Sequence, residues 1–102
     1  MTEPPITAKQ LRHSTAGGTP PPGLSPLSTA LWWEAKGSWQ RAHEIAQDVP
    51  GRDGAWVHAY LHRREGDAGN AAYWYRLAGR SHCLLPLDEE WEQIATALLV
   101  RS

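Results

Sequence analysis

Several residue types are scarce in this chain of 102 residues. It has no phenylalanine, one methionine and one cysteine, and ten Lys and Arg stand against eleven Asp and Glu. A single cysteine excludes an intrachain disulfide, which fits a reducing compartment. The formal net charge of −1 gives no electrostatic reason to expect nucleic acid or an anionic membrane as a partner.

Long apolar runs are also missing. No run approaches the roughly 18 residues that span a bilayer, and the first residues lack the basic and apolar regions of a signal peptide. We therefore expect a cytoplasmic protein. The short length allows one domain with a small core.

Tryptophan is unusually frequent, with six in the chain. Indole side chains should therefore supply much of the core or interface energy. Each indole that is buried also needs an acceptor for its N–H group.

Residues 1–26 differ in composition from the rest, because they hold six of the eight prolines and few large apolar side chains. This composition favours a flexible Pro/Gly-rich tail that cannot bury enough surface to fold alone. The alternative is an arm that docks on its own or another surface through Ile6 and Leu11, in the stretch ITAKQLR. We expect residues 27–102 to form the folded domain.

From Leu27 onward the apolar spacing is helical. Glycine followed by serine or aspartate, at Gly37-Ser38 and Gly66-Asp67, predicts a helix end and a new helix start. Asp53 and Asp88 are the expected N-caps of two further helices. The five predicted helices cover residues 27–36, 39–49, 54–65, 68–78 and 87–101.

The two hinges lie 29 residues apart and place Ala42 and Ala71 at equivalent positions, each five residues after a hinge glycine. This pattern resembles tetratricopeptide-type helical repeats, in which small residues let paired helices approach closely. The resemblance implies an all-α fold of two stacked helical hairpins, with the C-terminal helix covering the face that the last repeat leaves exposed. The stretch WVHAYLHRREGDAGNAAYWYRLAG also resembles a motif of small uncharacterised bacterial proteins, from which no activity is carried over.

The stretch HAYLH places His58 and His62 four residues apart on one helix. Helix geometry puts both, with Glu65, opposite the main apolar stripe, so we expect a solvated polar face. In stacked hairpins this face would join Thr29, Trp33 and Lys36 of the preceding repeat in one concave surface. We therefore predict a non-catalytic module that binds a protein, a peptide or a small polar ligand through Trp33, Lys36, His58, His62 and Glu65.

A metal site is the alternative interpretation of the same histidines, because imidazoles four residues apart on a helix can share a zinc or another transition ion. A third ligand is needed, and His82 with Cys83, or His43 with Glu44, could supply it. The pattern does not choose between these pairs. If the histidines do not form a metal site, we expect no cofactor.

Catalytic motifs are lacking: the chain has no nucleophile elbow, and EGDAG is too short for a phosphate-binding loop. A purely structural or assembly subunit is a further alternative. The predicted helix 68–78 is apolar nearly all round, and if the C-terminal helix packs elsewhere, Tyr73 and Leu77 become the surface of a homodimer.

Overall fold

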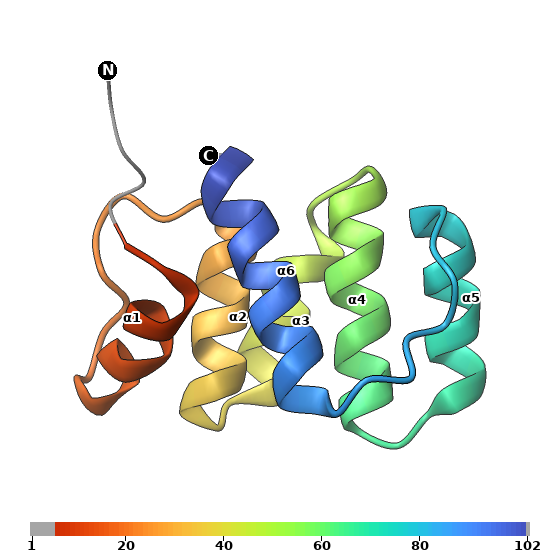
Figure 1. Cartoon of the computed structure of the whole chain (residues 1–102), viewed down its shortest axis with the longest axis horizontal. Coiled ribbons are helices and arrows are strands. Elements are labelled where there is room, and N and C mark those ends of the chain that lie inside the picture. Colours follow the sequence, from red (N-terminus) through yellow and green to blue (C-terminus); the bar gives the residue numbers. More distant parts are fainter. Residues whose placement is uncertain (1–5, 102) are drawn as a thin grey trace.

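The computed structural model describes residues 6–101, which are helical with no strand (Figure 1). The helices are α1 (Ala8–His13), α2 (Pro26–Lys36), α3 (Trp39–Gln47), α4 (Arg52–Arg64), α5 (Ala68–Ala78) and α6 (Leu87–Arg101), with a short 3₁₀ turn, η1 (Ser14–Ala16), after α1. The all-α class predicted from the sequence is confirmed.

The two predicted hinges have the same backbone hydrogen bonds. Gly37 and Gly66 have positive φ angles of 106° and 89°, which glycine adopts without a steric cost. At the first hinge the Ser38 N–H donates to Trp33 O over 2.8 Å, and at the second the Asp67 N–H donates to His62 O over 2.9 Å. The hinges turn α2 onto α3 and α4 onto α5, and α3 also packs against α4.

The predicted caps are correct in part. The Asp67 side chain accepts from the Asn70 N–H at the start of α5, as expected. Ser38 occupies the N-cap of α3, but its side chain makes no capping hydrogen bond. Asp53 and Asp88 were wrongly predicted as N-caps, because α4 begins at Arg52 and α6 at Leu87, so that both aspartates lie inside the first turn.

Helix α4 lies at the centre of the structure, since α2, α3, α5 and α6 all pack against it. Nine consecutive residues of α4, from Gly54 to His62, are buried. A helix that is enclosed in this way has no solvent-facing stripe along its middle turns.

Two buried glutamates connect α4 to its neighbours. Glu34 of α2 accepts from the Tyr60 hydroxyl over 2.8 Å and pairs with Arg64. Glu90 of α6 is fully buried and accepts from the Tyr75 hydroxyl and from the Arg63 guanidinium. Glu90 therefore lies in the first turn of α6 and is an internal ion-pair partner of Arg63.

Helix α6 crosses α2 and α4 and also contacts α1 (Figure 1). Its Trp91 donates its indole N–H to Leu31 O over 3.0 Å. Within residues 6–101, the indole N–H groups of Trp32 and Trp39 also donate, to Ser14 and to Leu61 O. The expected need for indole acceptors is confirmed for these three side chains.

The N-terminal segment is docked from Ile6 onward, as in the alternative of an arm that packs through Ile6 and Leu11, and residues 1–5 of the predicted tail lie outside the described residues. Thr7 and Gln10 form a capping box that starts α1, and Leu11 is fully buried. The Lys36 ammonium holds the following turn by donating to the carbonyl oxygens of Thr15 and Gly17. The proline content obscured a short amphipathic helix that gains stability only by packing on α2 and α6.

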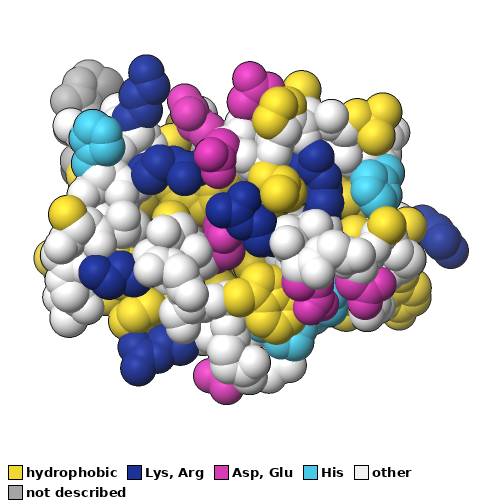
Figure 2. All heavy atoms as spheres, turned by 90° about the horizontal axis from the view of Figure 1, so that it is seen from below, with side chains coloured by type: hydrophobic (Ala, Val, Ile, Leu, Met, Phe, Trp, Pro, Cys, Tyr) yellow, Lys and Arg dark blue, Asp and Glu magenta, His cyan; other side chains and the backbone are white. Residues whose placement is uncertain are grey.

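Helix α5 lies at one edge, and its packing partner is α4. Because α6 packs elsewhere, Tyr73 and Leu77 are 50% and 49% exposed. Figure 2 shows basic and acidic side chains interspersed on one face of the molecule, as the balanced composition suggests. In the part of the chain that the structure describes, none of the helices combines the length and the hydropathy of a membrane span.

Candidate metal centre

Three histidines from two helices meet between α3 and α4. His58 and His62 come from successive turns of α4, and His43 of α3 faces them. One ring nitrogen of each histidine lies within 4.8 Å of those of the other two, and the Nε2 atoms of His43 and His58 are 3.0 Å apart. Tetrahedral zinc holds imidazole nitrogens about 3.4 Å from one another, because two bonds of about 2.1 Å meet near the tetrahedral angle. To bind one ion, the two ring nitrogens that lie farthest apart must therefore approach each other by at most about 1.4 Å.

Hydrogen bonds orient two of these rings. His62 Nδ1 lies 2.9 Å from a carboxylate oxygen of Glu65, which accepts its proton. Because Nδ1 carries the proton in this hydrogen bond, the lone pair of His62 is on Nε2. Carboxylates commonly orient metal-binding histidines in this way. One of the two Nε2 atoms of His43 and His58 donates a hydrogen bond to the other. The donating ring would bind an ion through Nε2 as its other neutral tautomer, with the proton on Nδ1.

The environment keeps His43 and His58 neutral. Burial, and after it the nearby His43 and His62, together lower the pKa of His58 to about 4. The pKa of His43 is also lowered, first by burial and then by His62, although Glu65 and Glu44 oppose the change. Neutral imidazole is the form that binds a metal ion, so ligation at neutral pH requires no loss of protons from the charged form.

Two tryptophans enclose the histidine cluster. Trp74 of α5 stacks on His58 with ring centroids 3.8 Å apart and planes 7° from parallel. Trp39 of α3 stacks on His43 at 4.8 Å and anchors its indole N–H on Leu61 O of α4. These contacts restrict the rings of His43 and His58 and limit the access of water to the cluster. The sequence pattern had not indicated either tryptophan as part of a site.

The expectation of a solvated histidine face is wrong. His58 and His62 are 6% and 8% exposed. The face opposite the main apolar stripe of α4 is covered by α3 and by Trp74 of α5. The residue pattern of α4 alone correctly identified the face that carries the histidines. It did not show that other helices cover this face.

The predicted groove residues divide into two groups. His58, His62 and Glu65 lie together, as described above. Lys36 is held by the N-terminal segment, and Trp33 lies under the Arg41 guanidinium, 4.3 Å from its ring centroid. Thr29 donates its hydroxyl proton to Ser25 O within the first turn of α2. No contact described for residues 6–101 brings Trp33, Lys36 or Thr29 to the histidine cluster.

The suggested third ligands are also separated. Of the pair on α3, His43 joins the cluster, whereas Glu44 accepts from Gln40 on the exposed face of the same helix. His82 packs against Tyr75, and Cys83 is half-buried beside it in the loop before α6. Within the described chain, the cluster of three histidines includes no cysteine or carboxylate ligand.

A second group, His62, Glu65 and Asp67, also has ligand-type atoms within 4.8 Å of one another. Both of its acids are exposed, and Asp67 is already engaged as the N-cap of α5. It shares His62 with the first cluster, so the two groups cannot be filled independently. The buried cluster of His43, His58 and His62 is the better candidate.

Comparison of this chain with protein-family models, with curated proteins and with solved structures finds no match. What the site can bind therefore follows from its own residues and their geometry.

Proposed function

We propose that this protein binds one divalent transition-metal ion, with zinc as the first choice, through His43, His58 and His62. The observation that carries the proposal is the convergence of three imidazoles from two helices with ring nitrogens within 4.8 Å of one another. The hydrogen bond from His62 to Glu65 supports it, because this bond leaves the lone pair of His62 on Nε2, where it can bind an ion.

Three protein ligands leave one position of a tetrahedral ion for water or another small molecule. Structural zinc sites usually have four protein ligands, whereas sites that exchange a ligand keep a position open. The set of three imidazoles is therefore typical of an exchangeable centre, such as a metal-dependent enzyme or a sensor. Imidazole ligands suit zinc, copper and nickel better than magnesium or calcium.

The experiment is a zinc titration of tag-free protein after chelator treatment, followed by calorimetry. We expect one ion per chain, and we expect binding to raise the midpoint of thermal unfolding, because the ion binds the folded state. Replacing His43 or His62 by Gln should weaken binding by at least about 100-fold, since removal of a direct ligand should exceed the 10- to 100-fold loss typical of outer-shell partners.

His82→Gln is the matched control, because it makes the same chemical change at an exposed histidine outside the cluster. It should bind zinc as the unaltered protein does. Circular dichroism of each metal-free variant separates loss of ligand from loss of fold. Equal affinity in the His43, His62 and His82 variants would refute the proposal.

We infer that the two hairpins are repeats of tetratricopeptide-like type. The 29-residue spacing of two hinges with matching hydrogen bonds supports this inference. The expected capping role of α6 is wrong, because α6 packs against α1, α2 and α4 and leaves α5, the last helix of the second hairpin, at the edge. A deletion of α6 that left α2 to α5 fully folded would contradict its packing against both hairpins.

We also infer that the protein associates with itself through the edge helix α5. Half-exposed Tyr73 and Leu77 support this inference, because they lie four residues apart on α5 and form one exposed apolar patch. Sedimentation velocity at micromolar concentration tests it, and a monomer that is unchanged by Tyr73→Asp would contradict it.

A further inference from the structure

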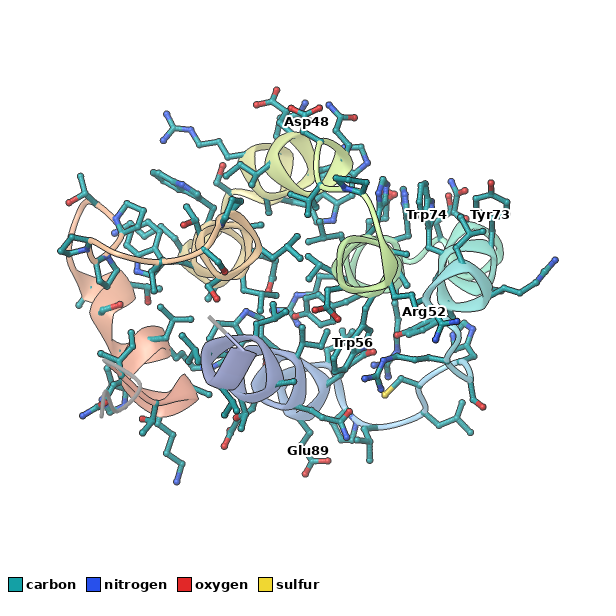
Figure 3. All side chains as sticks on the ribbon, turned by 90° about the horizontal axis from the view of Figure 1, so that it is seen from above. Asp48, Arg52, Trp56, Tyr73, Trp74 and Glu89 are labelled. Carbon is teal, nitrogen blue, oxygen red and sulfur yellow. The ribbon has the colours of Figure 1, made fainter. Side chains whose placement is uncertain are left out.

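A pocket of about 400 Å³ lies next to the histidine cluster. Residues of α4 and of the turn before it form its floor, α3 and the start of that turn form one wall, and Trp74 and Leu77 of α5 form the other. Figure 3 shows Trp74 projecting from α5 on the side of the structure where α3 lies. His58 belongs both to the pocket lining and to the cluster, so the pocket ends at the candidate metal centre.

The walls of this pocket are mainly apolar. Ala46, Val49, Pro50, Ala55, Trp74 and Leu77 contribute most of its side chains. Arg52 is the one charged residue in its lining within the described chain, and its guanidinium packs against Gly79 at the end of α5. The volume is near the lower end of the range for small-molecule sites, so the pocket fits a small ligand with an apolar body.

The charge of the centre indicates which chemical group of a ligand suits the open position on the metal ion. A divalent ion held by three neutral imidazoles keeps its full charge of +2, and Glu65 supplies a single negative charge through His62. An anionic fourth ligand would bring the centre to neutrality, which a half-buried site favours more strongly than an exposed one. A carboxylate is such a ligand, and zinc binds its oxygen readily.

We propose that the centre and this pocket together bind small monocarboxylates with an apolar tail. The carboxylate takes the open metal position and the tail lies against Trp74 and Leu77. The inference rests on the proposed metal site and adds the class of ligand that the site takes.

The test uses the whole chain loaded with Co²⁺, whose visible absorption responds to exchange of a ligand, and compares hexanoate with acetate. Each methylene buried in the pocket favours binding by about fourfold. Burial of two of the four additional methylenes of hexanoate therefore predicts binding at least about tenfold tighter than acetate.

Two matched variants test the position of the tail. Leu77→Asp places a negative charge in the pocket wall, whereas Tyr73→Asp makes a similar change on the same helix at a residue that does not line the pocket. The two side chains are equally exposed, at 49% and 50%, so neither variant should lose its fold. Leu77→Asp should abolish the preference for hexanoate without loss of Co²⁺, and Tyr73→Asp should keep both.

The outcomes separate the two proposals. If Co²⁺ does not bind to the histidines, the metal site itself fails and the carboxylate inference fails with it. If Co²⁺ binds and its spectrum shows no preference for hexanoate, only the ligand inference is overturned. An equal loss of preference in both variants would also overturn it, as would binding of hexanoate to metal-free protein with the same affinity.

Discussion

Gly54 offers a test of how closely α4 packs against the turn that precedes it. In the interior of a helix, replacing glycine by alanine is expected to stabilise the fold by about 1 kcal/mol. In this structure a Cβ atom at Gly54 would lie 2.0 Å from the carbonyl oxygen of Val49 and 3.0 Å from its carbonyl carbon. Both atoms belong to the backbone, so a change of side-chain rotamer cannot relieve the contact.

The chain must therefore move by more than about 1 Å, either in the turn after Val49 or at the start of α4. Overpacking of this kind costs about 1–3 kcal/mol. With the backbone displaced, we expect the upper part of this range, and the propensity gain of about 1 kcal/mol offsets only part of it. The net loss of about 2 kcal/mol corresponds to a fall of about 8–16 °C in the melting temperature of a domain of this size.

Gly69→Ala is the matched control. Gly69 is helical in α5, and the nearest atom that a Cβ would meet is an Asp67 oxygen at 3.9 Å, an ordinary contact. This variant should be as stable as the unaltered protein or up to about 1 kcal/mol more stable. Urea unfolding followed by circular dichroism measures both free energies. If Gly54→Ala is as stable as Gly69→Ala, the close approach of Val49 to α4 is incorrect.

Three further predictions concern the site, the buried phenols and the caps. Glu65→Gln should lower zinc affinity by about 10- to 100-fold in calorimetry, and an unchanged affinity would show that the carboxylate does not orient His62. The pKa values of Tyr60 and Tyr75 are raised, first by burial and then by Glu34 and Glu90 respectively. The unfolded chain ionises these phenols near pH 10, so their contribution to folding is complete below about pH 10 and is lost as the pH rises further. Phenolate absorbance from these two residues should therefore appear only together with loss of helical circular dichroism, and its appearance in folded protein would contradict their burial. Asp67→Ala should lower the free energy of unfolding by more than Ser38→Ala does, because of these two N-cap residues only Asp67 makes a capping hydrogen bond; equal losses in denaturant titrations would contradict this difference.

Part of the candidate site could be predicted from the sequence. The spacing of His58 and His62 indicates two ligands on one helix face, and His43 was one of the two alternatives for the third ligand. Nothing local distinguishes His43 from His82, because the choice depends on which segment packs against α4. The packing of α3 on α4 decides it, and the hairpin pattern predicts only that α3 packs on α2.

The burial of the site could not be predicted from one helix alone. The spacing of apolar residues along a helix shows which residues share a face. It does not show how many other helices pack around that helix. For α5, which has one packing neighbour, Tyr73 and Leu77 remain half-exposed. For α4, which has four, the polar face of His58 and His62 is internal.

The sequence by itself determined the five helices from α2 to α6 and the two hinges with matching hydrogen bonds, because these depend on residues within a few positions of one another. Glycine at a positive φ angle, capping side chains and apolar spacing are local properties. The tertiary structure decided where α1 and α6 pack, which acids become internal ion-pair partners and which histidine completes the cluster. These outcomes depend on contacts between residues far apart in the chain, such as Trp91 with Leu31 and His43 with His58.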